Sequence, residues 1–280
     1  MTLSIAHLGP PGTYAEAAAL ACVQQLATST GHQPLLCPYP SIAQTLQVVA
    51  DGQAHLAVVP VENSIEGGVT MTLDTVWQLD TLQIQQALVL PIFHALLSQA
   101  KTLEGIQTVY SHPQALAQCQ EWLGRHLPSA QLIPTNSTTE ALQHLDPKGA
   151  IAAIASQRAA QLYDVPVLAY PINDYPDNCT RFWMMSLQPS PGGSYTSLAF
   201  SVRANVPGAL VKPLQVFAKR GINLSRIESR PTKRSLGDYL FFIDLEASMN
   251  QETVQSALEE VKQYTEILKI FGSYNIMPIG

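Results

Sequence analysis

The sequence predicts an α/β protein with a large N-terminal part and a smaller C-terminal part. In the first part, short apolar runs alternate with segments of helical periodicity, an order typical of a sheet covered by helices. In the second part, the order strand, helix, strand, strand, helix, strand is typical of a ferredoxin-like domain. A Pro, Gly and Ser segment lies between two apolar segments and reads as a linker. We therefore predict domains at 1–188 and 196–280, joined by a linker at 189–195.

Strands and helices of the first part follow from apolar periodicity and from capping residues. Strands are expected at 4–8, 55–61, 108–110 and 150–155, with extended chain over 82–97. Helices are expected at 15–26, at 41–51, along the apolar face of 69–77, from Pro113 to about Leu123, and after Ser156. Ser41 with Gln44, and Ser137 with Glu140, have the spacing of capping boxes at helix starts.

The second part is predicted in the same way. Strands are expected at 196–203, 222–229, 239–246 and 267–274, and helices at 209–220 and 251–264. Gly221 follows the first of these helices and can end it in a left-handed conformation. A sheet with helices on one face commonly pairs with a second copy through the other face, so a homo-oligomer is expected.

Charge and composition exclude several classes of protein. The chain has 280 residues, 46% hydrophobic and 13% charged, with a net charge of -6. Residues 1–195 contain 5 Lys and Arg against 13 Asp and Glu, and residues 196–280 contain 10 against 8. A chain this acidic is a poor nucleic-acid binder, so no nucleic-acid partner is expected. The longest apolar run, 87–97, contains Pro91 and His94 and is too short to cross a membrane.

Location and metal content are predicted from what the motifs lack. No basic segment precedes an apolar run at the N-terminus, where the first cation is Lys101, so no secretory signal is expected. The four cysteines form no C-x-x-C pair, as is usual for isolated reduced thiols. A cytoplasmic protein without a membrane partner is therefore expected. No two histidines lie within four residues of each other, and no metal site is predicted.

Candidate ligand loops follow the strands, because open α/β sheets bind ligands beyond the carboxyl ends of their strands. The loop 9–14, with Thr13, opens a helix whose free N–H groups attract anions, although an ordinary tight turn explains it equally well. Asn63 and Ser64 follow a strand and precede two glycines, which suits ligand contact or a solvated Asx turn.

A third loop contains the adjacent pair Ser111 and His112. Adjacent side chains do not face each other, so this pair does not predict Ser–His catalysis, and a helix-capping serine is the ordinary reading. Gln118 lies one helical turn further on and can approach the same mouth.

Arg181 is selected by elimination. Of the five cations in the first 195 residues, it alone lies in the dense polar segment 173–182. An anionic ligand would have to use Arg181 and helix N-termini as its counter-charges. A surface ion pair of Arg181 with Asp174 or Asp177 fits the spacing equally well.

These motifs together resemble the prephenate dehydratase family with a C-terminal ACT regulatory domain, nearly from end to end. The seven blocks, in family order, are Gly9-Pro10-x-Gly12-Thr13-Tyr14, Pro60-x-Glu62-Asn63-Ser64-x-x-Gly67, Tyr110-Ser111-His112-Pro113-Gln114-Ala115-Leu116, Ala153-Ile154-Ala155-Ser156, Asp174-x-x-x-Asn178-x-Thr180-Arg181-Phe182, Gly208-Ala209-Leu210 and Ile222-Asn223-Leu224-x-x-Ile227-Glu228-Ser229-Arg230-Pro231. The fifth block is the most diagnostic. Ala15 departs from the Ser or Thr of many members, as does Thr139 from the alanine of a further family block. By this resemblance we expect the chain to begin at the dehydratase, without the chorismate mutase of bifunctional relatives.

The resemblance implies a two-lobed catalytic domain similar to type II periplasmic binding proteins, with the active site between the lobes. The implied reaction is the decarboxylating dehydration of prephenate to phenylpyruvate, which needs no cofactor. Thr180 is the implied proton donor to the leaving hydroxyl group. The implied substrate-binding residues are Thr13, Asn63, Ser64, Ser111, Gln118 and Arg181, although Arg181 could instead brace its loop.

Regulation by L-phenylalanine is also implied by the resemblance. The effector would bind between subunits of a homodimer or homotetramer, and its residues are Gly208, Ala209, Leu210, Asn223, Leu224, Glu228, Ser229 and Arg230. Free N–H groups after Pro207 can receive an α-carboxylate at the start of the predicted helix. Two alternatives stay open: an arogenate dehydratase, and a non-catalytic amino-acid-sensing binding protein. The intact Thr180 block argues against the second, because binding alone needs no proton donor.

Overall fold

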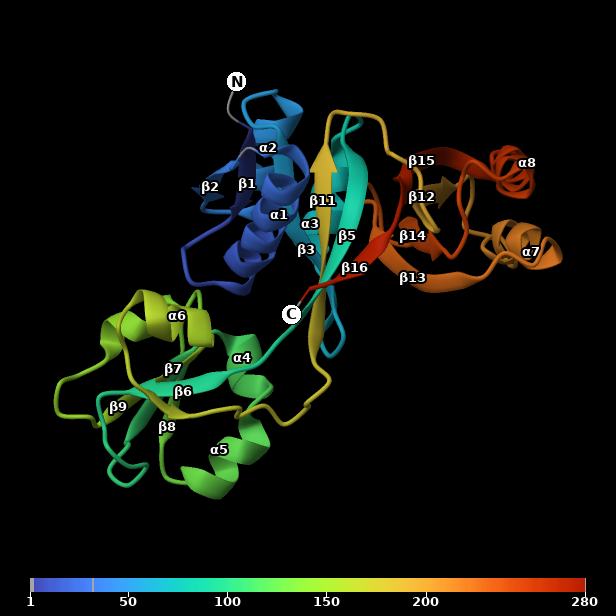
Figure 1. Ribbon diagram of the computed structural model, residues 1–280. Helices are drawn as coiled ribbons and strands as arrows, with labels where there is room; N and C mark the ends of the chain where they lie inside the picture. Colours follow the sequence, from blue (N-terminus) through green and yellow to red (C-terminus); the bar gives the residue numbers. More distant parts are fainter. Residues whose placement is uncertain (1–2, 32, 280) are drawn as a thin grey trace.

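Three sheets organise the computed structural model, which describes residues 3–31 and 33–279 (Figure 1). The seven-stranded sheet forms lobe 1, with the order β16-β5-β11-β3-β1-β2 and β4 beside β3. Its strands are β1 (Ser4–Leu8), β2 (Leu35–Tyr39), β3 (Leu56–Asn63), β4 (Gly67–Gly68), β5 (Gln83–Pro91), β11 (Cys179–Ser186) and β16 (Ile276–Pro278). Its helices are α1 (Tyr14–Thr30), α2 (Ile42–Ala50) and α3 (Thr70–Gln78).

Lobe 2 is built on the five-stranded sheet β10-β6-β9-β7-β8. Its strands are β6 (Ala95–Ser98), β7 (Thr108–Ser111), β8 (Gln131–Pro134), β9 (Ile151–Ala155) and β10 (Val167–Ala169). Its helices are α4 (Pro113–Ala117), α5 (Gln120–His126), α6 (Gln157–Leu162) and a 3₁₀ turn at Glu140–His144. The chain enters this lobe after β5 and leaves it before β11, so β11 inserts antiparallel between β3 and β5. This double crossing confirms the two-lobed fold that the family resemblance implied.

Capping residues set the starts of the predicted helices. The Thr13 side chain accepts the N–H of Glu16 at the start of α1, and Ser41 does the same for Gln44 at α2. Ser156 accepts the N–H of Ala159 in α6. The predicted helix 113–123 is instead broken at residues 118–119 into α4 and α5. The segment after Ser137 forms only a 3₁₀ turn.

The C-terminal domain has the predicted βαββαβ order, with sheet order β13-β14-β12-β15. Its elements are β12 (Tyr195–Val202), α7 (Val211–Lys219), β13 (Leu224–Pro231), β14 (Tyr239–Leu245), α8 (Glu252–Val261) and β15 (Thr265–Tyr274). Helices α7 and α8 cover one face, where Leu198, Phe217 and Val261 belong to a single buried core.

The other face of this domain packs against lobe 1. Phe242, Phe271 and Tyr274 share one hydrophobic core with Ile84 and Trp183 of the lobe 1 sheet. The face that the sequence left for a second copy is therefore covered by the same chain. Strand β16 then extends parallel to β5, so the last strand completes the sheet of lobe 1 rather than that of the C-terminal domain. The pairing of β16 with β5 was not predicted.

Candidate active site

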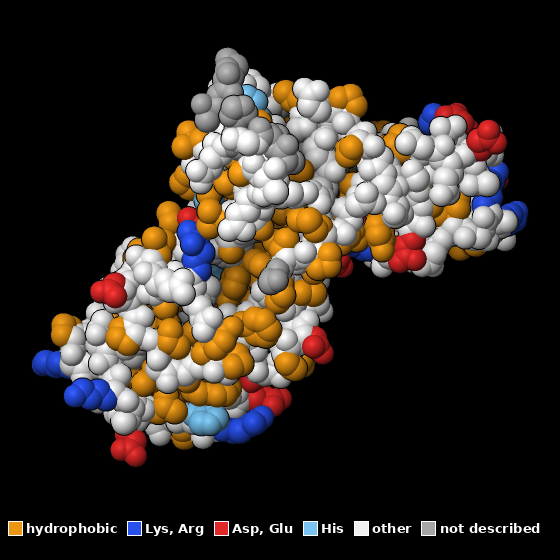
Figure 2. Space-filling model, in the orientation of Figure 1, with side chains coloured by type: hydrophobic (Ala, Val, Ile, Leu, Met, Phe, Trp, Pro, Cys, Tyr) orange, Lys and Arg blue, Asp and Glu red, His pale blue; other side chains and the backbone are white. Residues whose placement is uncertain are grey.

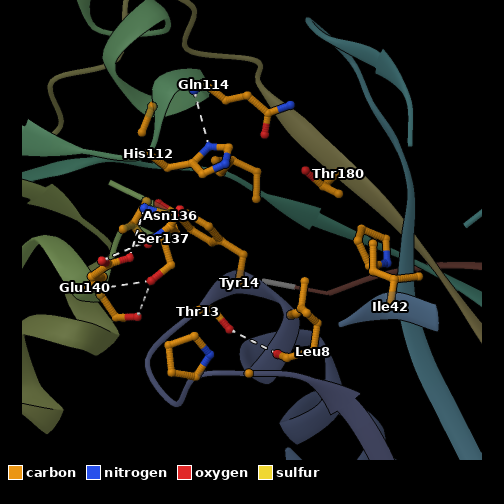
Figure 3. A pocket seen from close by; sticks show the side chains of 18 of the residues that line it. Leu8, Thr13, Tyr14, Ile42, His112, Gln114, Asn136, Ser137, Glu140 and Thr180 are labelled. Carbon is orange, nitrogen blue, oxygen red and sulfur yellow. Dashed lines mark hydrogen bonds between the residues drawn. The ribbon is translucent and has the colours of Figure 1, made fainter. Parts of the chain in front are cut away.

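A cavity of about 1300 Å³ lies between the lobes. It is lined by the β1–α1 loop, the end of β3 with β4, the start of α4, residues 136–143 and Thr180 of β11 (Figure 3). In the space-filling view, many charged side chains lie toward the far ends of lobe 2 and of the C-terminal domain, and hydrophobic side chains predominate where the lobes meet, next to a basic side chain at the edge of the junction (Figure 2). Among the described lining residues there is no Lys or Arg, and the acidic ones are Glu66 and Glu140.

Contacts between the start of α1 and α6 join the two lobes. Glu16 Oε2 accepts the Gly12 N–H at 2.8 Å and pairs with Arg158 Nε at 2.8 Å across the lobes. Burial opposes the Glu16 charge, but the hydrogen bond from Arg158 lowers the pKa of its carboxyl group. Ser156 Oγ also donates to the Gly12 carbonyl at 2.8 Å. Gly12 has φ 87°, a left-handed conformation that favours glycine, which suits this close approach.

Asn63 fixes the orientation of the Thr180 hydroxyl group. Its Oδ1 accepts the N–H groups of Ile65 and Glu66, both at 3.0 Å, so its Nδ2 must face the opposite way. That Nδ2 donates to Thr180 Oγ1 at 3.0 Å. The threonine oxygen is thereby an acceptor, and no described residue accepts its proton. Thr180 is 9% exposed and lines the cavity, so its O–H is free to donate to a ligand there.

Asn178 carries this hydrogen-bonded chain across to lobe 2. Its Oδ1 accepts Asn63 Nδ2 at 2.8 Å, and its own Nδ2 donates to Gln118 Oε1 at 2.8 Å. The same oxygen of Gln118 lies 2.9 Å from His94 Nε2, so it is the acceptor and His94 Nε2 is the donor. A buried network therefore joins His94 to Thr180, and each amide orientation in it is set by the one before.

His94 is kept neutral by its surroundings. Burial lowers the pKa of His94, against the smaller raising effect of its bond to Gln118. With its proton on Nε2, the ring has its Nδ1 at 3.1 Å from the Tyr14 oxygen. The Tyr14 hydroxyl donates its single proton to the Phe93 carbonyl at 2.6 Å, and burial raises the pKa of Tyr14 well above its usual range. Both side chains line the cavity, so the network ends in uncharged groups.

Four of the predicted substrate-binding and catalytic residues meet in this cavity. They are Thr13, Asn63, Gln118 and Thr180. Two others do not line it. Ser64 Oγ accepts the Cys179 N–H at 3.0 Å and ties β3 to β11. Ser111 is fully buried and donates to the Ile154 carbonyl at 2.7 Å, which holds β7 to β9.

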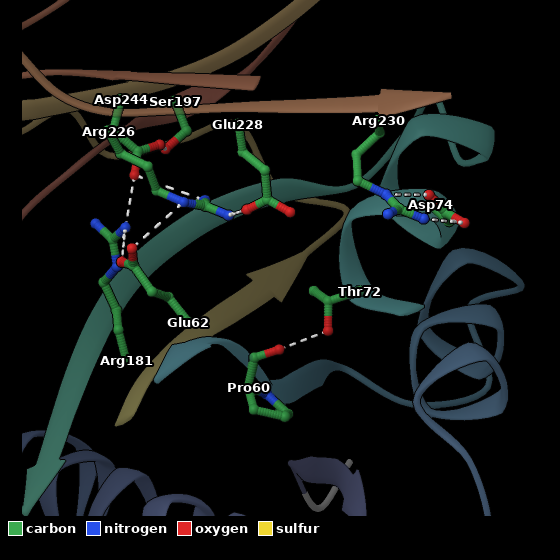
Figure 4. Close-up of polar contacts among 10 residues, drawn as sticks. All are labelled: Pro60, Glu62, Thr72, Asp74, Arg181, Ser197, Arg226, Glu228, Arg230 and Asp244. Carbon is green, nitrogen blue, oxygen red and sulfur yellow. Dashed lines mark hydrogen bonds and ion pairs between the residues drawn. The ribbon is translucent and has the colours of Figure 1, made fainter. Parts of the chain in front are cut away.

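Arg181 does not reach the cavity, contrary to the preferred reading of the sequence. Successive residues of a strand point to opposite faces, so Thr180 faces the cavity and Arg181 faces the C-terminal domain. Its guanidinium pairs with Glu62 Oε2 at 2.6 Å and with Asp244 Oδ2 at 2.7 Å (Figure 4). Burial opposes its charge, but Asp244 raises the pKa of Arg181 above its usual value. The second reading, that Arg181 braces its segment, agrees with these partners.

The predicted effector residues divide between two faces of β13. Ile227 and Ser229 pair in register with Ile243 and Phe241, which belong to the face covered by α7 and α8. Glu228 and Arg230 point the other way, toward lobe 1. Glu228 pairs with Arg226 at 2.6 Å.

Arg230 Nε forms an ion pair at 3.1 Å with Asp74 Oδ1, which belongs to α3 of lobe 1. Glu228 and Arg230 thus have partners that the sequence did not predict. The remaining effector residues lie before α7 and at the start of β13. Gly208 is exposed ahead of α7 with φ 79°, and Ala209 and Leu210 are half-buried. Asn223 is exposed and donates to Glu246 Oε2 at 2.7 Å, and Leu224 packs at the edge of the helical core.

The fold and site together define a two-lobed enzyme with an appended regulatory domain. The profile of the prephenate dehydratase family matches residues 5–190, and that of the ACT domain matches residues 196–263. The chain therefore belongs to the prephenate dehydratase family and carries an ACT domain.

Several proteins are similar to this chain over nearly all of its length. A bifunctional chorismate mutase/prephenate dehydratase of Aquifex aeolicus is 42% identical over 97% of this chain and 73% of its own length. A prephenate dehydratase of Lactococcus lactis is 36% identical over 99% of both chains. The structure of an Arthrobacter aurescens prephenate dehydratase in complex with L-Phe superposes with a TM-score of 0.86 and 35% identity, covering 98% of this chain and 90% of that one. GqqA, described as a quorum quenching acylase, superposes with a TM-score of 0.80 and 30% identity, covering 97% of each chain.

Sequence reasoning missed the residues that connect the site. His94 was visible only as a polar interruption of the apolar run 87–97, and that interruption was a usable signal. Asn178 and Tyr14 were seen in motifs but given no role. Among the described residues, no group of three or more His, Cys, Asp or Glu is placed to hold a metal ion, and no helix has both the length and the apolar character to span a membrane.

Proposed function

We propose that this chain converts prephenate to phenylpyruvate in the cavity between the lobes, with Thr180 donating to the leaving hydroxyl group. The observation that carries this proposal is the Thr180 hydroxyl, held as an acceptor by Asn63 at 3.0 Å while its own proton stays available. In the reaction, the bond to the ring carboxylate breaks and its electron pair completes the aromatic ring. The C–O bond breaks with its pair on oxygen, which leaves as water after gaining a proton. The net reaction thus consumes one proton.

A neutral donor suits this reaction. A hydroxyl is a poor acid in water, and its contribution comes from preorganised donation as charge develops on the leaving oxygen. A strong cation beside the carboxylate that leaves as CO₂ would stabilise the ground state and slow its loss. The described lining agrees with this requirement, because it contains no Lys or Arg. The second carboxylate of prephenate would be held by neutral donors and by the N-terminus of α1 at Thr13.

The ACT domain supports feedback control by L-phenylalanine. We propose binding where residues 208–210 of one subunit meet the exposed face of β13 in a neighbour, within a homodimer or homotetramer. Val206, Val211 and Ile227 are between 48% and 60% exposed near these positions, which suits a subunit contact. We also propose a cytoplasmic location, since all four cysteines are unpaired.

The deciding experiment is turnover of prephenate and of arogenate by the purified full chain, with formation of phenylpyruvate and of phenylalanine measured. We expect prephenate to be consumed and L-phenylalanine to inhibit it. Preferential turnover of arogenate would assign the alternative dehydratase. Tight binding of an amino acid without turnover of either substrate would assign the sensor.

A further inference from the structure

One step of the β3–β11 ladder holds catalytic and structural contacts on opposite faces. Thr180 pairs in register with Asn63, and the next pair in the ladder is Arg181 with Glu62. The first pair faces the cavity and holds the hydrogen bond that orients the Thr180 hydroxyl. The second pair faces the C-terminal domain and is joined by an ion pair of 2.6 Å. A backbone shift at the second pair would therefore also move the first, because the two pairs are adjacent in both strands.

Asp244 of β14 is the partner that the C-terminal domain supplies to this step. It is 1% exposed and accepts Ser197 Oγ at 2.5 Å. Its other oxygen pairs with Arg181 at 2.7 Å and lies 3.8 Å from Arg226. Ser197 in turn bonds to the Tyr274 hydroxyl at 2.6 Å, so the carboxylate has a fixed position. A charge this deeply buried tolerates little displacement from its partners.

A second contact leads from the same cluster to the cavity lining. Arg226 of β13 lies 3.6 Å from Glu62 and pairs with Glu228 at 2.6 Å. The Glu228 carboxylate packs directly on Gly68, leaving no room for a Cβ atom there. Gly68 itself lines the cavity. The C-terminal domain thus contacts the site in two places, behind Thr180 and beneath Gly68.

We propose that Arg181 and Asp244 form a positioning pair, through which the C-terminal domain holds Thr180 and Asn63 in their catalytic arrangement and transmits effector binding. This inference rests on the proposed function. Strand β13 gives the physical link, because Ile227 and Ser229 face the helical side while Arg226 and Glu228 face the cluster. An effector that shifts β13 on one face moves the ion cluster on the other.

The test compares two Asp→Asn variants of the full chain. Asp244→Asn keeps the shape of the buried partner and removes its charge. Asp80→Asn is the matched control, since Asp80 also bridges the domains through Lys269 but is 75% exposed. It precedes β5 beside the Ser186 end of β11, away from Thr180. Steady-state rates with prephenate are measured for each variant, with and without L-phenylalanine.

We expect Asp244→Asn to lower kcat by about tenfold or more while KM changes by less than about threefold, as for a residue acting through another. Inhibition by phenylalanine, about 5- to 150-fold for ordinary allosteric coupling, should fall below about twofold. Asp80→Asn should keep both values. A folded Asp244→Asn variant with the rate and inhibition of the original chain would overturn the inference, as would equal losses in both variants.

A milder variant and a structural readout complete the test. Ser197→Ala removes one hydrogen bond to Asp244. It should lower kcat and weaken inhibition by phenylalanine, and it serves as the test if Asp244→Asn does not fold. Hydrogen exchange in residues 179–186 should speed up in both cluster variants and stay unchanged in Asp80→Asn. Unchanged hydrogen exchange in the cluster variants would overturn the inference, whether or not the protein consumes prephenate. Failure of the original chain to consume prephenate would instead refute the proposed function.

Discussion

Replacing Thr180 by Val tests the proposed donor with the least change in shape. The valine keeps the β-branched form that suits β11 and removes only the hydroxyl. Loss of a positioned proton donor costs about 10²- to 10⁴-fold in kcat, which corresponds to about 2.7–5.4 kcal/mol of barrier. Because the described lining around Thr180 is otherwise intact, KM should change little. Asn63 Nδ2 keeps Asn178 Oδ1 at 2.8 Å and the Cys179 carbonyl at 3.1 Å as acceptors.

Stability should therefore fall only by about 0.5–1.5 kcal/mol, the net value of one hydrogen bond. The assay is phenylpyruvate formation at saturating prephenate, with urea unfolding of the same samples. Thr180→Ser is the control, because it keeps a hydroxyl that Asn63 can orient, and it should retain most of the activity. A folded Thr180→Val variant with turnover within about threefold of the original would refute the assignment of Thr180 as donor.

Three other outcomes are expected. Because burial lowers the pKa of His94, the unfolded chain binds a proton at this histidine more readily than the folded chain does. The contribution of His94 to the free energy of unfolding is therefore present above about pH 6.5 and is lost as the pH falls below that value. His94→Gln should reduce the loss of melting temperature between pH 7 and pH 5, and an unchanged loss would contradict this. Arg181→Ala should lower the free energy of unfolding by about 3–5 kcal/mol, since Asp244 is left buried without its main partner, while KM for prephenate holds. A steep rise in KM in a stable Arg181→Ala variant would show instead that Arg181 binds the substrate. Burial raises the pKa of Cys22 to about 12 and that of Cys119 further, so thiol labelling of the native protein should be slow at both. Fast labelling of Cys22 would show that α1 opens locally.

Sequence reasoning located the parts of this protein whose causes are local. Caps such as Ser41 and Ser156 depend on residues three positions away, and the helix starts they predict are confirmed. The βαββαβ order follows from periodicity within each segment, and it is confirmed as well. Thr180 and Asn63 came from motif resemblance, and the structure brings them within hydrogen-bond distance.

The features that were missed depend on contacts between distant segments. Spacing alone allowed Arg181 to face either side, because the strand that sets its orientation was read as a polar loop. Its partner Asp244 lies 63 positions away in another domain. The break between α4 and α5 places Gln118 against Asn178, a contact 60 positions apart that no local pattern encodes. Long-range pairing of this kind decides where a polar side chain points.

The last strand has a consequence for recombining this protein. Strand β16 extends the lobe 1 sheet at β5, where the Ala87 N–H bonds to the Asn275 carbonyl at 3.0 Å and the Ile279 N–H bonds to Val89 at 2.9 Å. The ACT domain is thus fastened to the same sheet by the segment that enters it and by the segment that leaves it. Its own sheet is separate from that of lobe 1, but because both of its ends are held to the lobe 1 sheet, it does not move as a freely tethered module. A chimera that takes everything after residue 195 from another protein would place a foreign edge strand in the sheet of lobe 1. Such a chimera should therefore keep residues 276–278 of the protein that supplies lobe 1.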